Sequence, residues 1–348
     1  MNILVTGHLG YIGTVLTALL KSHGHTVVGL DTGYFEDGVI AGVPVAPDRE
    51  LRKDIRKVEA QDLEGMDAVV HLAAISDDPM GQLNPKLTDD INHLASVRLA
   101  RVAKEAGVSR FVFASSCSMY GAAGGDQALD ESASFSPITA YAHSKVDAET
   151  GIRKLAQDGF SPTFLRNATA YGASPRIRLG TLVVNNLMGW AITTGKVLIK
   201  SDGTPWRPLV HVEDICGACM AVIDAPIADV HNEAFNVGQD AENFQVKDIA
   251  EVVRKEVPGA VVEYAEGGQG DRRSYRVSFE KIKKQLPQFT FKWTLNAGVE
   301  NLHKLFKEIP LTAQMFQDRR FIRLQKLQYL MDNKIVDENL YWISNERS

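Results

Sequence analysis

The chain has 348 residues, of which 45% are hydrophobic and 23% are charged, a composition typical of globular proteins. Its length allows two domains, or one large domain with an inserted lobe. A formal net charge of -5 argues against a nucleic-acid partner, because surfaces that follow a phosphate backbone are usually basic. The chain enters an apolar run directly, without a secretory signal, and no apolar stretch approaches the ~20 residues that span a bilayer. We therefore expect a soluble cytoplasmic protein with no nucleic-acid or membrane partner.

Apolar strands alternate with helical patterns along the first half of the chain, which is typical of a parallel sheet with helices on both faces. We expect strands at residues 2–7, 26–31, 67–74, 110–116 and 161–168, and helices at 11–24, 90–107 and 140–159. Val69 and Val70 follow one another without polar alternation, as in a strand that is buried on both faces. Beyond Tyr171 the pattern loosens into a smaller lobe, and residues 312–343 are predicted to form terminal helices.

A glycine-rich turn joins the first expected strand to the first expected helix. Gly7, Gly10 and Gly13 have no side chains, so the backbone can turn tightly and approach a diphosphate, which then meets the free N–H groups of the helix. Asp31 ends the second strand, eighteen residues after Gly13. A carboxylate at this point accepts both hydroxyls of an adenosine ribose and repels a 2′-phosphate. Since no arginine follows it directly, the pattern predicts NAD rather than NADP.

Tyr141 and Lys145 open a later helix and are one helical turn apart, so both side chains leave the same face. A tyrosine has an ordinary pKa of ~10, and poising it near pH 7 takes ~4 kcal/mol of stabilisation of the phenolate. A lysine ammonium and an oxidised nicotinamide ring can supply that stabilisation together. The phenolate can then take a proton from a sugar hydroxyl while hydride leaves the same carbon. The Tyr-x-x-x-Lys spacing is common in helices and gains its weight from the glycine turn and from "SSCSMYG" at 115–121.

These motifs resemble the extended short-chain dehydrogenases/reductases of the NAD-dependent nucleotide-sugar epimerase and dehydratase family, in particular UDP-galactose 4-epimerases. The resemblance covers roughly residues 1–310. It rests on "TGHLGYIG" (6–13), Asp31, "KDI" (53–55), "HLAA" (71–74), "SSCSMYG", "YAHSK" (141–145), "LRNATAYG" (165–172) and "RPLVHVED" (207–214). It implies Ser116, Tyr141 and Lys145 as the catalytic residues, because the catalytic hydroxyl of this family lies four residues before the tyrosine of Tyr-Gly.

The resemblance also implies how the two ligands are held. Cofactor contacts would come from Gly7, Gly10, Tyr11, Ile12, Gly13, Asp31, Asp54, Ile55, Leu72, Ala73, Ala74, Asn92, Ser115, Tyr141, Lys145 and Asn167. Substrate contacts would come from Ser116, Asn186, Leu187, Arg207, Arg272 and Arg273. Arg207 would clamp the sugar-nucleotide diphosphate, since the planar guanidinium suits a phosphate. Trp206, Arg176 and Arg178 could equally line the sugar pocket or cover surface, and no metal is expected.

The implied fold is α/β, a Rossmann-type doubly wound parallel sheet with a smaller mixed α/β substrate-binding lobe. Residues 1–175 and about 207–237 would form the NAD-binding domain, and residues 176–206 and 238–310 would form the lobe that binds the nucleoside diphosphate (NDP)-sugar. Residues 311–348, beyond the resemblance, would form a C-terminal helical extension without a predicted function. The family usually forms homodimers through a four-helix bundle, here the helices at roughly 90–106 and 141–157.

Departures from the family pattern discriminate among its activities. The 4,6-dehydratases have Thr-Asp-Glu at the positions of Ser116, Cys117 and Ser118, because elimination of water needs an acid and a base. Decarboxylases have glutamate, and 3,5-epimerases and GDP-fucose synthases have cysteine, where this chain has Ser118. Cys117 is one position off and is expected to pack in the core. Cys216 and Cys219 have metal-like spacing, but they lie on an apolar helical face and are expected to be buried thiols.

The sequence therefore predicts an NAD-dependent NDP-sugar epimerase that acts at C4 through a transient 4-keto intermediate. An alternative is a reductase of an NDP-4-keto-deoxysugar that consumes NAD(P)H. A 4,6-dehydratase and a non-catalytic NAD-binding scaffold are less favoured. The base and the sugar of the substrate are not predicted.

Overall fold

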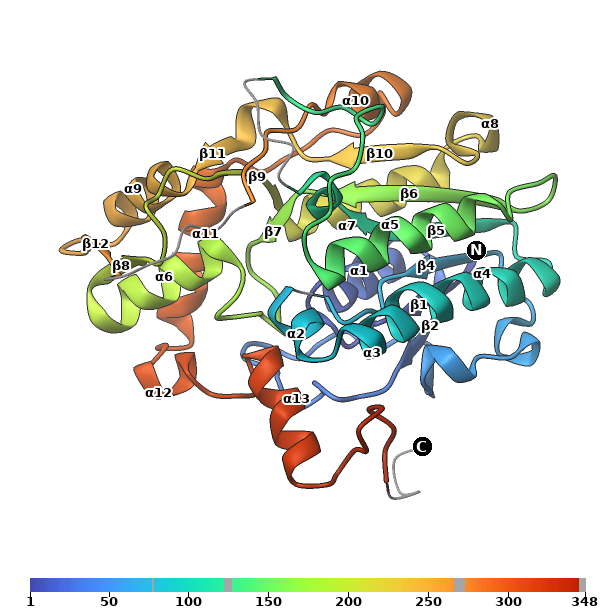
Figure 1. Cartoon of the computed structure of the whole chain (residues 1–348), viewed down its shortest axis with the longest axis horizontal. Helices are drawn as coiled ribbons and strands as arrows, with labels where there is room; N and C mark the ends of the chain where they lie inside the picture. The colour runs from blue at the N-terminus through green and yellow to red at the C-terminus, as the bar shows by residue number, and fades with distance from the viewer. Residues whose placement is uncertain (77, 122–126, 266–272, 344–348) are drawn as a thin grey trace.

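The computed structural model describes residues 1–76, 78–121, 127–265 and 273–343 (Figure 1). Within them, seven strands form one large sheet in the order β10-β6-β5-β4-β1-β2-β3, and all neighbouring pairs are parallel. The strands are β1 (Asn2–Thr6), β2 (Thr26–Asp31), β3 (Arg49–Arg52), β4 (Ala68–His71), β5 (Arg110–Ser116), β6 (Ser161–Asn167) and β10 (Ala234–Val237). The order of the strands reverses between β1 and β4, and a doubly wound sheet binds its ligand in the crevice at this point.

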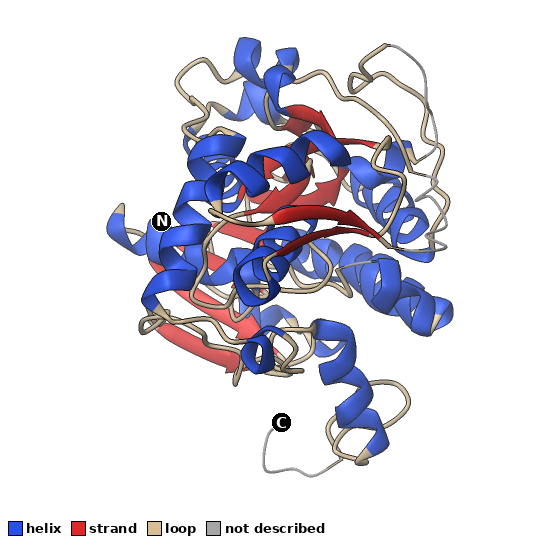
Figure 2. Cartoon of the chain, turned by 90° about the vertical axis from the view of Figure 1, so that its left-hand side faces the viewer, coloured by secondary structure: helices blue, strands red, loops and turns tan. Residues whose placement is uncertain are grey.

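Helices cover both faces of this sheet, as Figure 2 shows with helices in blue and strands in red. Helices α1 (Tyr11–Ser22) and α7 (Val212–Asp224) pack on one face, in a core that includes the buried thiols of Cys216 and Cys219. Helices α4 (Ala95–Glu105) and α5 (Ala140–Arg153) pack on the other face. The predicted α/β class with a doubly wound parallel sheet is confirmed.

A smaller group of elements lies at one end of the large sheet, on the left of Figure 1. It contains a three-stranded sheet of β7 (Thr169–Tyr171), β9 (Trp206–His211) and β11 (Asn243–Gln245), and a pair of β8 (Lys196–Ile199) and β12 (Val261–Tyr264). Helices α6 (Val183–Thr194), α9 (Val246–Glu256) and α11 (Leu295–Glu308) share a third apolar core with these strands.

The remaining elements are short. They are η1 (Ile55–Lys57), η2 (Ala60–Leu63), α2 (Asp78–Leu83), α3 (Pro85–Asp89), η3 (Asp90–Leu94), η4 (Cys117–Tyr120), α8 (Ile227–Val230), η5 (Asp240–Glu242), α10 (Glu280–Gln285), α12 (Ala313–Phe316) and α13 (Arg323–Asp332). The sequence pattern missed β3, because this strand lies at the sheet edge and its residues Arg49–Arg52 are mostly exposed and charged. A strand without a buried face carries no apolar signal.

The last described segment, residues 312–343, runs below the blue strands β1 and β2 in Figure 1 and contains the two helices α12 and α13. Leu327, Leu330, Val336 and Leu340 are buried in the same core as α4 and α5. The predicted terminal helices are therefore present, and they are part of the apolar packing. Among the described residues, no helix combines the length and the apolar character that a membrane crossing requires.

Candidate active site

A single cavity of about 550 Å³ extends from the carboxyl ends of β1, β2, β4 and β5 to the smaller group of elements. It is lined by most of the residues predicted to bind the cofactor, namely Gly7, Gly10, Tyr11, Ile12, Gly13, Asp31, Asp54, Ile55, Leu72, Ala73, Ala74, Ser115, Tyr141, Lys145 and Asn167. The predicted substrate residues Ser116, Asn186, Leu187, Arg207 and Arg273 line it as well. A volume of this size lies in the range of small-molecule and cofactor sites.

Among the described residues, one predicted cofactor residue, Asn92, does not line this cavity. Asn92 is fully buried behind the wall, where its side-chain amide pairs with the backbone N–H and C=O of Ile75 at 2.8 and 2.9 Å. Asn92 thereby fixes the backbone where the chain leaves β4, and it supports the cavity wall from behind. Arg272 lies outside the described residues.

The glycine turn has no room for side chains. Gly7 has a positive φ of 76°, and a Cβ on it would lie 2.8 Å from the backbone nitrogen of Ala73. A Cβ on Gly13 would lie 2.1 Å from the carbonyl oxygen of Gly7. The turn therefore brings bare backbone against the next strand end and into the cavity. This is the arrangement that lets a diphosphate approach a helix amino terminus.

Asp31 is held in place at the end of β2. The backbone N–H of Leu9 donates to one carboxylate oxygen at 3.1 Å, and that of Gly33 donates to the other at 2.8 Å. Each oxygen keeps a further lone pair for a ribose hydroxyl. Farther along the cavity, Ser118 Oγ and Asn167 Oδ1 are buried without a hydrogen-bond partner in the described part of the chain, so they can pair with a ligand. These residues fit a dinucleotide.

Helix α5 presents Tyr141 and Lys145 to the same cavity. Thr139 caps the helix by accepting from the N–H of Ala142 at 3.1 Å, so Tyr141 lies in the first turn. The Lys145 ammonium donates to the carbonyl oxygen of Ala114 at 2.7 Å and lies 4.6 Å from the ring centroid of Phe113. Burial lowers the pKa of Lys145 to about 7. A negative charge that develops beside Lys145 would therefore stabilise its ammonium form.

Three successive side chains at the end of β5, those of Ser115, Ser116 and Cys117, have different surroundings. The Ser116 hydroxyl lines the cavity and accepts from the N–H of Ser118 at 3.1 Å. The Cys117 thiol is buried, does not line the cavity, and donates to the carbonyl oxygen of Arg166 at 3.1 Å. Burial raises the pKa of this thiol, which disfavours the reactive thiolate. These contacts agree with the prediction that Cys117 packs in the core.

A buried ion pair anchors helix α5 to the large sheet. Glu149, one turn after Lys145, accepts from Arg166 Nη2 at 2.6 Å, from Arg153 Nη2 at 3.0 Å and from the Ser115 hydroxyl at 3.1 Å. Since Ser115 and Arg166 lie on β5 and β6, this one carboxylate ties α5 to both strands. The orientation of α5, which carries Tyr141 and Lys145, therefore depends on it.

The far end of the cavity is basic. Arg207 on β9 donates to the carbonyl oxygens of Trp206 and Arg273, at 2.7 and 2.5 Å, which holds the 273–275 segment beside it. Arg273 pairs with Asp78, and Asp78 also accepts from the Thr139 hydroxyl. Two of the predicted substrate cations are thus brought together, within one network that reaches Thr139 at the start of α5.

Sequence reasoning missed several residues that line the cavity. They are Asp78, Lys200, Ser201, Tyr275 and Arg323, together with Arg178, for which a surface position was an open alternative. Asp78 follows the "HLAA" strand end, so its place at a carboxyl edge was a usable signal. The other residues come from segments that only the tertiary fold brings to the crevice.

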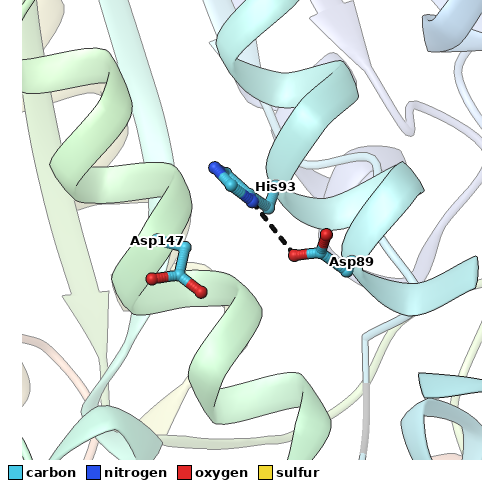
Figure 3. Close-up of side chains that lie close together, drawn as sticks. All are labelled: Asp89, His93 and Asp147. Atoms are coloured by element: carbon cyan, nitrogen blue, oxygen red, sulfur yellow. Dashed lines mark hydrogen bonds and ion pairs between the residues drawn. The ribbon is translucent and has the colours of Figure 1, made fainter. Parts of the chain in front are cut away.

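Outside the cavity, Asp89, His93 and Asp147 gather three potential metal ligands (Figure 3), whose ligand atoms lie within 4.8 Å of one another. His93 pairs with Asp89 at 3.0 Å one helical turn away, and Asp147 approaches from α5. Both aspartates are exposed, and exposed acidic groups of this kind are common without a metal. We assign no role to this cluster.

Comparisons with known proteins agree with this geometry. The profile of the NAD dependent epimerase/dehydratase family matches residues 3–238. A UDP-glucose 4-epimerase from Corynebacterium glutamicum is 30% identical, over 82% of this chain and 90% of its own. The structure of MoeE5 with UDP-glucuronic acid and NAD aligns with a TM-score of 0.75 and 27% identity, over 88% of this chain and 99% of that one.

A structure of the NDP-hexosamine 5,6-dehydratase TunA aligns with a TM-score of 0.76 over 88% of this chain and 98% of that one, and at 22% identity this likeness bears on the fold alone. The family match covers more than half of the chain and includes the glycine turn, Asp31 and the Ser116–Tyr141–Lys145 set. It also confirms NAD as the cofactor. The chain belongs to the NAD dependent epimerase/dehydratase family, as an enzyme of the short-chain dehydrogenase/reductase type.

Proposed function

We propose that this protein is an NDP-sugar 4-epimerase with tightly held NAD. The observation that carries the proposal is the chemistry around Ser116 and Tyr141. Among the described residues at this part of the cavity, the carboxylate is Asp78, and it is committed to Arg273 and Thr139. Elimination of water needs an available acid and base. Serine at positions 116 and 118 therefore favours oxidation and reduction at one carbon over dehydration.

The proposed roles follow from where each side chain lies. The chemistry expected of bound NAD is reversible hydride acceptance. Ser116 positions the 4-hydroxyl of the sugar, and Tyr141 removes its proton and later returns it. The Lys145 ammonium favours the phenolate of Tyr141. Arg207 binds the diphosphate of the substrate, so the ketosugar can rotate in the pocket and be reduced on its other face.

The relatives support this activity more than its rivals. The Corynebacterium glutamicum relative is named a UDP-glucose 4-epimerase, and the MoeE5 structure contains a UDP-sugar. A reductase of a 4-keto sugar would use the same Ser116, Tyr141 and Lys145. It would need an external reductant, and Asp31 disfavours the 2′-phosphate of NADPH.

We expect purified protein to interconvert UDP-glucose and its C4 epimer, or UDP-glucuronic acid and its C4 epimer, without added cofactor. Proton NMR of the anomeric region distinguishes the epimers, and denaturation of the protein should release NAD. An Asp31→Ala variant should lose activity that added NAD restores in part. Stoichiometric NADPH consumption on a 4-keto substrate, without epimer formation, would establish the reductase instead.

We further propose that the protein forms a homodimer through a four-helix bundle of the η3–α4 segment and α5. These two helical segments lie side by side, and Leu94 on η3 is 52% exposed. We expect Leu94→Glu to convert the dimer to a monomer in sedimentation velocity experiments, because it places a charge in an apolar interface. Ile227→Glu, which alters a similarly exposed apolar side chain on the remote α8, should leave the dimer intact. A monomeric wild-type protein would contradict the proposal.

A further inference from the structure

The C-terminal extension encloses the adenosine end of the cavity. Its segment 312–343 is tied to the loops that follow β2 and β3. The indole of Trp342 donates to the Thr32 carbonyl oxygen at 2.9 Å, and Lys326 pairs with Asp37 at 2.5 Å. Further contacts are those of Tyr34 with the Leu340 carbonyl oxygen and of Arg56 with the Asn339 carbonyl oxygen and the Tyr341 ring. Leu327 and Leu340 line the cavity directly. The extension is therefore one wall of the cofactor site.

Arg323, the first residue of α13, is the charged member of this wall. Only 4% of it is exposed, and its guanidinium lies over the ring of Phe35, 4.2 Å from the centroid. It lines the cavity together with Asp31 and Arg178. Nη1 and Nη2 of Arg323 are buried and have no hydrogen-bond partner among the described residues. A buried guanidinium without an acceptor is costly, so its persistence calls for an anion.

The surrounding protein charges do not supply that anion. Arg178 and Arg176 are nearby buried guanidiniums; Arg178 donates to Ser76, and Arg176 to the carbonyl oxygens of Phe35 and Glu36. Of the neighbouring carboxylates, Asp31 accepts from two backbone N–H groups, and Asp37 pairs with Lys326. The pKa of Arg323 is lowered to about 9 by burial and by the positive charge of Arg178. Positive charge is therefore in excess at this point of the cavity.

We propose that Arg323 of the C-terminal extension binds the diphosphate of the bound dinucleotide. The cavity at Arg323 is continuous with the glycine turn, whose backbone receives a diphosphate. Asp31 occupies the place of the ribose hydroxyls, and its charge disfavours a 2′-phosphate as the anion that Arg323 takes. A diphosphate offers the fork of oxygen acceptors that suits a guanidinium. The extension thus retains the cofactor, which an enzyme that reuses its NAD requires.

The test compares three variants of the full-length protein freed of cofactor. Arg323→Met removes the charge, Arg323→Lys keeps it without the fork, and Arg320→Met is the matched control, because Arg320 is exposed and pairs with Asp318. Isothermal titration calorimetry with NAD, ADP-ribose, NADP and adenosine separates the diphosphate from the other groups. We expect Arg323→Met to weaken NAD and ADP-ribose about 10- to 100-fold, with adenosine unchanged. The affinity of Arg323→Lys for NAD and ADP-ribose should fall between those of Arg323→Met and the wild type. The affinities of Arg320→Met should match those of the wild type.

Thermal unfolding of the cofactor-free proteins gives a second readout. Because Arg323→Met removes an unpaired buried charge, its midpoint should equal or exceed that of the wild type, while the upward shift on adding NAD becomes smaller. A lowered midpoint with equal weakening of all four ligands would assign Arg323 to packing and overturn the proposal. Selective loss of NADP affinity would assign it to a 2′-phosphate, and unchanged NAD affinity would exclude a role in binding; either result overturns the proposal.

Discussion

Tyr141→Phe is expected to lower the turnover number for epimerisation by about 10²- to 10⁴-fold, the usual contribution of a positioned acid–base group. The change removes one hydroxyl from the first turn of α5 and leaves the Thr139 cap, which holds that turn, in place. The Michaelis constant should change little, because the lost hydroxyl transfers a proton in the transition state and contributes little to the binding of the substrate. Steady-state epimerisation, followed by NMR, measures both constants.

Tyr275→Phe is the control for this experiment. Tyr275 is another of the tyrosines that line the same cavity, on the segment that Arg207 holds. Loss of the Tyr275 hydroxyl should change the Michaelis constant. The variant should keep at least a tenth of the wild-type turnover number. If Tyr141→Phe retained the wild-type turnover number, this result would contradict both proposals for the site, epimerisation and 4-keto reduction.

Glu149→Leu is expected to lower the free energy of unfolding by about 3–5 kcal/mol, because it leaves the buried Arg166 without its counter-charge. The same change should reduce the turnover number, since Glu149 ties the catalytic helix to β5 and β6. Urea unfolding followed by circular dichroism measures the first effect. Asp158→Asn, in the exposed turn after the same helix, should change stability by less than about 1 kcal/mol.

A double variant separates the ion pair from its parts. Arg166→Met combined with Glu149→Leu removes both charges and should be more stable than Glu149→Leu alone, since an apolar pair of similar size is often tolerated where one unpaired charge is not. Arg153, which also donates to Glu149, is partly exposed, so water can solvate its guanidinium when Glu149 is removed. A double variant less stable than Glu149→Leu would show that Glu149 acts through packing and not through charge.

The sequence could predict the large sheet and a shared cavity position for Tyr141 and Lys145, because the signals for both are local. The glycine turn and Asp31 lie within one strand–helix–strand unit, and Tyr141 and Lys145 lie within one helical turn. The strand β3 was missed because Arg49–Arg52 is mostly exposed and charged, and Leu51 is its one apolar residue, partly buried against the core.

Arg323 was beyond sequence reasoning for a different reason. Among the polar and apolar residues of 312–343 it reads as a solvent-facing position of an amphipathic helix. Its burial arises when α13 meets Phe35, a residue of the loop after β2. The pairing of Asp78 was also beyond sequence reasoning, although its position was not, because its partner Arg273 is 195 positions away. Pairings over such distances leave no periodic trace in the sequence.

The hydrogen bond from Trp342 to Thr32 joins residues 310 positions apart. During synthesis, β1, the glycine turn and β2 leave the ribosome before residues 312–343, and the two strands are joined locally through α1. The wall at the adenosine end cannot close until residues 312–343 have emerged. A nascent or prematurely ended chain would therefore contain the sheet and the catalytic helix, but it would expose an open cofactor crevice.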